Sequence, residues 1–165
     1  MQHGYNHELH YDEPWSFDGG IDLFFCSTGF DERKDLFRSV DWDGINLCVR
    51  GIWRGMESSP LCDSVQNGTM NNRDLPVMYA NAAINLNIHR TSKAWTMNGD
   101  GQQHIDEADS LGPRVFEILA SGGFLLTDHR KEMDGFLKDG ENCAVFSDAA
   151  SLERQIRFYL QNPVE

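Results

Sequence analysis

Short apolar runs alternate with amphipathic stretches along most of the chain, and this alternation constrains the fold more than any other feature. The apolar runs have the length of buried strands, whereas the stretches between them repeat apolar residues at helical spacing. Strands separated by helices are typical of a parallel sheet covered on both faces. The sequence therefore predicts an α/β domain with a Rossmann-like parallel sheet and helices on both faces. The predicted strands are Ile21 to Cys26, Ile45 to Val49, a short one near Val65, Ala83 to Ile88, Phe124 to Thr127 and Cys143 to Phe146.

The predicted helices begin at residues that favour helix starts. Asp31, Asn72 and Asp148 each carry a side chain that can cap a helix. Pro113 suits the first position of another helix, because the amide hydrogen that proline lacks has no partner there. A short further helix is predicted from Lys131 to Leu137. The polar stretch from 89 to 110 has no predicted element, and loops that long are usually functional lids or disordered.

Charge and targeting signals exclude several classes of function. The chain has 26 acidic and 14 basic side chains and a formal net charge of −12. A field of that sign repels nucleic acid and anionic membranes, whereas a small anionic ligand responds mainly to local groups. No apolar run approaches the roughly 20 residues of a membrane span, and residues 1–5 lack the features of a signal peptide. We therefore expect a cytoplasmic protein with reduced cysteines.

Ligands of open parallel sheets bind beyond the carboxyl ends of the strands, where the strand order reverses. This rule brings together the loop after Cys26, the loop after Ile88 and the start of the helix at Pro113. A cation in the first turn of that helix, Arg114, opposes the macrodipole at a cost of about 0.3–1 kcal/mol. The cost is offset if Arg114 meets an anion, which the helix N-terminus also favours.

Three anions are candidates for Arg114: Asp109, Glu117 and a bound phosphate. Arg114 and Glu117 are three residues apart on one stripe of the predicted helix. In one hypothesis Arg114 contacts a phosphate and Glu117 accepts hydrogen bonds from ribose hydroxyls. A local ion pair between Arg114 and Glu117, with no ligand, explains the pattern equally well.

The order of the segments resembles the C-terminal, donor-binding domain of GT-B glycosyltransferases. The likeness is to the CgeB-like group in particular, which is related to the retaining family-4 enzymes. It depends on the order and spacing of several segments over nearly the whole chain. These segments are FFCSTGFDERKDLF, DWDGINLCVRGIW, Leu75 to Ala82, INLNIHRTS, SLGPRVFEILASGGFLLTD and GFLKDGENCAVFSDAASLERQIRFYLQNP.

The resemblance implies roles for individual residues. Glu117 would hold the ribose of the donor nucleotide, and the turn that begins at Ser27 would approach the pyrophosphate. In the related retaining enzymes a second acid lies eight positions before the ribose glutamate, and that register falls on Asp109. Asp109 and Arg114 are therefore the predicted catalytic residues. The other predicted donor-binding residues are Ser27, Thr28, Gly29, Arg50, His89, Arg90, Ser110, Leu111 and Gly112.

The implied function is transfer of a sugar from a nucleotide-diphosphate sugar, with retention of configuration. No metal or other cofactor is expected, because cationic side chains and a helix terminus can offset the charge of the leaving diphosphate. One alternative is a nucleotide-sugar epimerase of the same fold, and another is a stand-alone binding or assembly module without catalysis. The substitution Glu117→Ala would abolish nucleotide affinity in both enzymes but would change only stability in the third case.

The resemblance also implies a domain organisation. Residues 1–18 resemble the linker between the two domains of these enzymes, and residues 19–165 form the nucleotide-sugar-binding domain. The acceptor-binding N-terminal domain would then be a missing partner, so the chain alone is expected to bind donor without transferring sugar. A homo-oligomer would be one way to cover the exposed interdomain face.

Several other motifs have simpler interpretations. Asp41-Trp42-Asp43 precedes a predicted strand, so we interpret it as a solvated turn rather than a metal site. The histidines at 3, 7 and 10 lack a recognisable zinc spacing. Trp53 and Trp95 could stack on a base or sugar, although core filling is the default.

Overall fold

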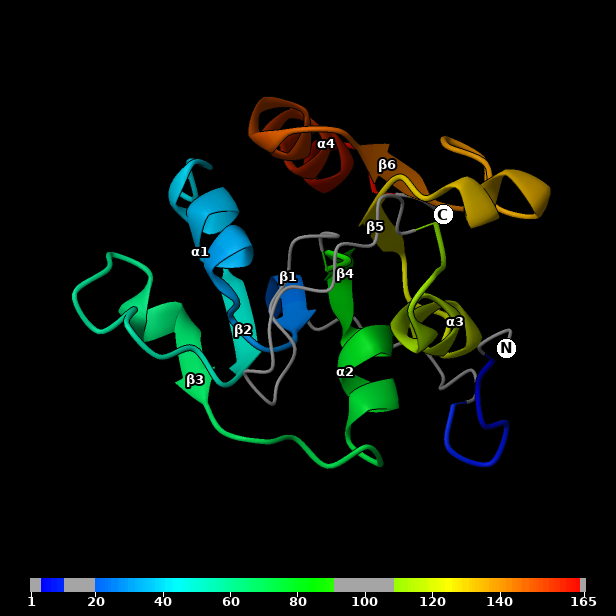
Figure 1. Ribbon diagram of the computed structural model, residues 1–165, viewed down its shortest axis with the longest axis horizontal. Coiled ribbons are helices and arrows are strands. Elements are labelled where there is room, and N and C mark those ends of the chain that lie inside the picture. Colours follow the sequence, from blue (N-terminus) through cyan, green and yellow to red (C-terminus); the bar gives the residue numbers. More distant parts are fainter. Residues whose placement is uncertain (1–3, 11–19, 91–108, 164–165) are drawn as a thin grey trace.

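The computed structural model describes residues 4–10, 20–90 and 109–163. Its strands form one sheet in which all neighbours are parallel, in the order β3-β2-β1-β4-β5-β6. Figure 1 shows the sheet with helices interleaved between the strands, which confirms the predicted α/β, Rossmann-like fold class. The strands are β1 (Ile21–Cys26), β2 (Leu47–Gly51), β3 (Val65–Asn67), β4 (Ala82–Asn87), β5 (Leu125–Asp128) and β6 (Ala144–Phe146).

Helices cover both faces of the sheet, as predicted (Figure 1). Side chains of α1 and α4 pack on one face with Phe25, and those of α2 and α3 pack on the other with Phe24. Neighbouring strand residues contribute to opposite cores because successive side chains of a strand point to opposite faces. The helices are α1 (Asp31–Arg38), α2 (Leu75–Asn81), α3 (Pro113–Ala120) and α4 (Ala149–Gln161), with 3-10 turns η1 (Cys62–Ser64) and η2 (Lys131–Gly135).

Two of the predicted helix caps are wrong. Asp31 is the first residue of α1 rather than its cap, and α2 begins after Asp74 rather than after Asn72. Neither helix has a side-chain cap, and packing of their apolar faces holds them instead. The predicted cap at Asp148 is confirmed, because its carboxylate accepts a hydrogen bond from the Ser151 amide at 2.7 Å.

Other boundaries shift without changing the topology. The strand predicted from Ile45 begins at Leu47, and the helix predicted from Lys131 to Leu137 is a shorter 3-10 turn. Cys26, Cys48, Cys62 and Cys143 are unpaired, in agreement with the expected reduced thiols. None of the helices formed by the described residues is long and apolar enough to cross a bilayer.

The strand order reverses between β1 and β4, which lie side by side at the centre of the sheet. The chain proceeds from β1 to β2 and β3 on one side, then returns to β4 and continues to β5 and β6 on the other. The connection that leaves β1 leads to α1, on one face, and the connection that leaves β4 leads to α3, on the opposite face. The carboxyl ends of β1 and β4 therefore form the topological switch point where ligands of such sheets bind.

Candidate functional site

Arginines from separate elements gather at the carboxyl ends of the central strands. Arg33 lies on α1, and Arg114 lies in the first turn of α3. Arg50 lies on β2 opposite Cys26, where the pairing of β2 with β1 ends. The positive charge of Arg114 lowers the pKa of Arg33. Burial raises the pKa of the Cys26 thiol, and the charges of Arg114 and Arg50 oppose that rise. Together with the pairing of Arg50 opposite Cys26, they indicate a local group of positive charges in a chain whose formal net charge is −12.

The hydroxyl of Ser27, directly after β1, joins two of these arginines. Its oxygen accepts hydrogen bonds from Arg33 Nη1 at 2.7 Å and from Arg114 Nη1 at 3.3 Å. A hydroxyl oxygen has two lone pairs, so both are engaged and the hydroxyl hydrogen is left as a donor. Within the described part of the chain, no protein atom accepts that hydrogen.

Arg33 connects the two strands that flank the switch point. Its guanidinium also donates to the carbonyl oxygens of Thr28, at 2.9 Å, and of Ile88, directly after β4. Only 5% of Arg33 is exposed. Burial lowers its pKa to about 10, and the charge of Arg114 acts in the same direction. Arg33 is therefore still charged at neutral pH.

The prediction of site residues missed Arg33. The signal that could have found it is helical spacing, because Arg33 lies four residues before Phe37, and both are buried on the same face of α1. A cation on an apolar stripe needs buried partners. Here the turn after β1 supplies them.

Arg114 does not form the local ion pair with Glu117 that the sequence left open. Both residues are described, and among the described residues no ion pair joins them. Arg114 reaches the turn after β1 instead. Glu117, one turn further along α3, is half-buried. Its negative charge contributes to the raised pKa values of Cys26 and Tyr79.

Tyr79 of α2 forms a buried polar neighbour of Arg114. No hydrogen bond of ordinary geometry joins its hydroxyl to a described residue, although Arg114 lies close enough to interact with it. Burial raises the pKa of Tyr79, and the positive charge of Arg114 opposes that rise without reversing it. The phenol therefore stays protonated, so its O–H group can donate a hydrogen bond and its oxygen can accept one.

The turn Ser27–Gly29 is held against the end of β2. The Gly29 amide donates to the Ile52 carbonyl at 2.9 Å, and Trp53 Nε1 donates to the Ser27 carbonyl at 2.8 Å. A Cβ atom at Gly29 would come within 2.6 Å of the Trp53 ring. Trp53 has no exposed surface, so the idea that it stacks on a ligand is wrong and core filling is confirmed. Trp95 lies outside the described residues.

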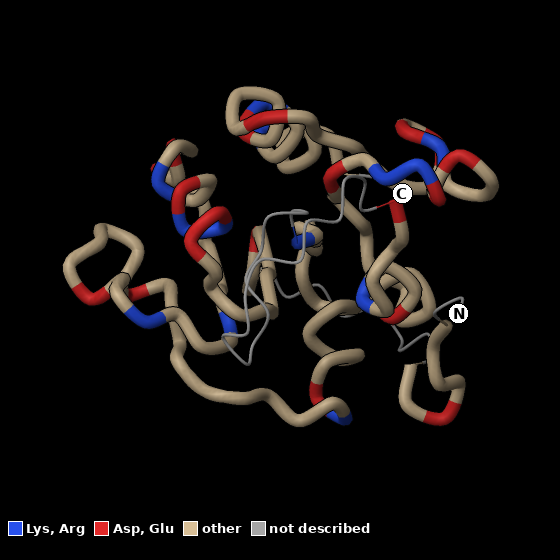
Figure 2. Tube along the Cα trace, viewed as in Figure 1, with Lys and Arg blue, Asp and Glu red and all other residues tan. Residues whose placement is uncertain are grey.

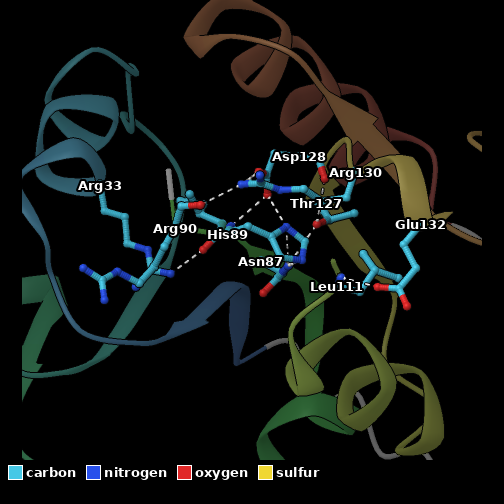
Figure 3. A network of polar contacts seen from close by, with 10 residues as sticks. Arg33, Asn87, His89, Arg90, Leu111, Thr127, Asp128, Arg130 and Glu132 are labelled. Atoms are coloured by element: carbon cyan, nitrogen blue, oxygen red, sulfur yellow. Dashed lines mark hydrogen bonds and ion pairs between the residues drawn. The ribbon is translucent and has the colours of Figure 1, made fainter. Parts of the chain in front are cut away.

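A second polar network lies at the carboxyl ends of β4 and β5, as Figure 3 shows. Asp128 Oδ1 accepts from the His89 amide at 2.9 Å and from His89 Nδ1 at 2.7 Å. Asp128 Oδ2 lies 3.2 Å from Arg130 Nη2, which also donates to the Arg90 carbonyl at 2.9 Å. Burial raises the pKa of Asp128, but the hydrogen bonds from His89 and the charge of Arg130 lower it further, so the net shift is downward.

His89 and Arg90 occupy different positions around the predicted site. The His89 imidazole is buried, with Asn87 Nδ2 at 3.3 Å from Nε2, so it belongs to the network rather than to an exposed surface. The Arg90 guanidinium lies 4.0 Å from the centre of the Phe30 ring, next to the turn after β1. The Arg90 side chain thus extends from β4 toward β1.

The residues that lead into α3 divide into two groups. Asp109 and Ser110 are exposed, and among the described residues the Asp109 carboxylate contacts none of the arginines. Leu111 is buried, and its amide donates to Glu132 Oε2 at 2.7 Å. Gly112 is the N-cap of α3. The structure therefore does not bring the two predicted catalytic residues, Asp109 and Arg114, into contact.

The other candidate motifs lie elsewhere. The Asp41 carboxylate accepts from the Asp43 amide at 3.0 Å and pairs with Arg157 at 3.2 Å, so Asp41-Trp42-Asp43 is a turn. A cavity of about 500 Å³ lies beside this turn and is lined by Trp42 and by residues before β2 and β3. It lies at the opposite end of the strands from Arg33, Arg50 and Arg114. In the described ranges, no group of histidine, cysteine and acidic side chains forms a metal site.

Comparison with known families matches residues 33–165 to a family described as glycosyl transferase-like. The match covers more than half of the chain, including most of α1 and all of β4 and α3. No curated protein matches the chain closely. The family match agrees with the resemblance to CgeB-like glycosyltransferases, and the chain therefore belongs to the glycosyl transferase-like family.

Proposed function

We propose that the chain binds the diphosphate of a nucleotide-sugar donor at the switch point between β1 and β4. The observation that carries the proposal is the convergence of Arg33 and Arg114 on the Ser27 hydroxyl. Two guanidinium groups repel one another, and a bound polyanion offsets that repulsion. The unused Ser27 hydrogen supplies a further donor for a phosphate oxygen, which can only accept.

Buried nitrogen atoms support the same assignment. The Nε atoms of Arg50 and Arg114 are buried and lack a partner among the described residues. Buried donors are nearly always satisfied in native proteins, so these two atoms favour a ligand with several acceptor oxygens. Cationic groups placed around a leaving diphosphate can stabilise its developing charge without a metal ion.

Membership of the glycosyl transferase-like family supports a sugar donor rather than another anion. Glu117 follows Arg114 by three residues, so both side chains project from the same stripe of α3. A carboxylate can accept hydrogen bonds from two neighbouring hydroxyl groups. We therefore assign Glu117 to the ribose and Arg114 to the diphosphate. By the family resemblance, we propose transfer with retention and place Asp109 toward the donor sugar.

The decisive experiment is calorimetric titration of the chain with UDP, GDP and ADP, first without and then with divalent metal. We expect one diphosphate to bind in both conditions. Arg33→Met and Arg114→Met should each weaken that binding by about tenfold or more, the equivalent of one charge-assisted hydrogen bond. Arg38→Met is the matched control, because Arg38 lies on the same helix as Arg33 but is half-exposed. Among the described residues, its side chain makes polar contacts only with Asp35 of its own helix and with Met56.

The outcomes separate the alternative functions. If the folded wild-type chain binds none of the three nucleotides, the proposed donor site is refuted. If it binds one and Glu117→Ala abolishes the affinity, the site is that of a nucleotide enzyme. If Glu117→Ala changes only stability, the ribose assignment is wrong and a binding or assembly module is favoured.

A further inference from the structure

One short segment after β5 holds the chain on both sides of the site. Residues 128–132 begin at the last residue of β5, and alternate side chains of this segment make the contacts seen in Figure 3. Asp128 binds the His89 amide and imidazole, and Arg130 binds the Arg90 carbonyl. The backbone that leaves β4 is therefore held at two consecutive residues.

Glu132 holds the backbone that leads into α3. Its Oε2 atom accepts from the Leu111 amide at 2.7 Å, and its own amide donates to the Asp109 carbonyl at 3.2 Å. These two bonds flank Ser110. The Leu111 side chain, 1% exposed, packs in the core beneath α3. The start of α3 is thus joined to the same segment that holds the end of β4.

The two arginines of the switch point depend on these two backbones. Arg33 donates to the Ile88 carbonyl, one residue before the His89 amide that Asp128 binds. Arg114 lies three residues after the Leu111 amide that Glu132 binds. Residues 128–132 therefore hold both the peptide that Arg33 contacts and the start of the helix that carries Arg114.

We propose that Asp128, Arg130 and Glu132 are positioning residues that set the spacing of Arg33 and Arg114 so that both contact one diphosphate. This inference rests on the proposed function of the switch point. Binding by two preset groups avoids the entropy of ordering them around the ligand. A ligand with a single phosphate needs that spacing less, because it can be bound by one arginine at a time.

The test compares inorganic pyrophosphate with orthophosphate as calorimetric probes of the whole chain. Glu132→Ala should weaken pyrophosphate binding by about tenfold, the loss of one charge-assisted hydrogen bond, while orthophosphate affinity changes much less. Glu132→Gln should restore pyrophosphate binding, because its carbonyl oxygen can still accept from the Leu111 amide. Glu141→Ala is the control, since Glu141 is exposed and its carboxylate pairs with no side chain but Lys138 in the described part of the chain.

Thermal unfolding of each variant shows whether a change in affinity arises from a change in folding. Unaltered pyrophosphate affinity in a folded Glu132→Ala variant would overturn the positioning role and leave the proposed function intact. Equal losses for both probes would overturn it as well, because they indicate general damage to the site. If the wild-type chain itself fails to bind pyrophosphate, the diphosphate site and its positioning residues are both refuted.

Discussion

At the scale of single residues, the site depends on the shape of the arginine side chain. Arg33 donates to one hydroxyl and two carbonyl oxygens, which belong to Ser27, Thr28 and Ile88. A planar guanidinium presents its donors in a rigid fork, whereas a lysine ammonium is a compact point charge. Only arginine therefore joins the ends of β1 and β4 and still carries a charge toward a ligand.

Gly51 is the residue whose replacement should disturb this turn most directly. Its φ of 127° is unfavourable for other residues, and an added Cβ would overlap the Ser27 carbonyl oxygen. We expect Gly51→Ala to lower the free energy of unfolding by about 2–3 kcal/mol and to weaken diphosphate binding. Urea denaturation measures the first effect and calorimetry the second.

Gly55 provides the matched control for that substitution. Its φ is also positive, at 80°, but no atom lies within 4 Å of an added Cβ. Gly55→Ala should cost only about 1 kcal/mol and leave binding unchanged. Equal effects of the two substitutions would show that backbone strain, rather than contact with Ser27, dominates at Gly51.

At the scale of elements, the helices have different tasks. Helix α3 carries Arg114 and Glu117, and its N-terminus is held by Glu132 through Leu111 rather than by a side-chain cap. Helix α4 packs against β4 and β6 and carries its own capping box. We therefore expect changes in the cap of α4 to affect stability without affecting ligand binding.

Asp148 tests this separation through its pH dependence. The Ser151 amide donates to its carboxylate and lowers its pKa below the ordinary value. A carboxyl with a lowered folded pKa stabilises the protein above its unfolded pKa of about 3.9, and the contribution is lost as pH falls through the folded value. Asp148→Ala should therefore lower the melting temperature at pH 7, with a difference that shrinks below about pH 4.

Melting curves of both proteins between about pH 3 and pH 7, the range in which a carboxyl titrates, provide the measurement. A difference in melting temperature that persists undiminished at the acidic end would contradict an ionised cap. Diphosphate affinity at neutral pH is the internal control. A loss of affinity in Asp148→Ala would contradict the division of tasks between α3 and α4.

At the scale of the whole molecule, global and local charge have opposite signs. The net charge is −12, and Figure 2 shows acidic residues distributed over the outer helices and turns. The arginines at the switch point form a local exception. A small anion responds to the near groups, whereas a long polyanion experiences the field of the whole surface.

This contrast predicts selectivity by ligand size. The chain should bind inorganic pyrophosphate at about 100 mM salt but should not bind duplex DNA under the same conditions, because a phosphate backbone needs an extended basic surface. Fluorescence anisotropy with labelled DNA, beside the pyrophosphate titration, measures both. Salt-dependent DNA binding that pyrophosphate displaces would contradict the prediction.

The architecture could be predicted from the amino-acid sequence, because strands and helices depend on local patterns of apolar residues. Short apolar runs predicted the six strands, period-3.6 repeats of apolar residues predicted the four α-helices, and the capping residue Asp148 was identified from one side chain. The rule that ligands bind beyond strand ends, together with the family resemblance, placed Ser27, Arg114 and Glu117 in one region. Their roles in binding a nucleotide stay predictions.

Which of these residues contact one another depends on the folded arrangement of the elements. Arg33 and Arg114 lie far apart in the sequence, and their convergence on Ser27 depends on the sheet that brings β1, α1 and α3 together. The choice between a local Arg114–Glu117 pair and a contact across the fold could not be made from spacing alone. Spacing describes one helix, whereas partner choice depends on what packs against it.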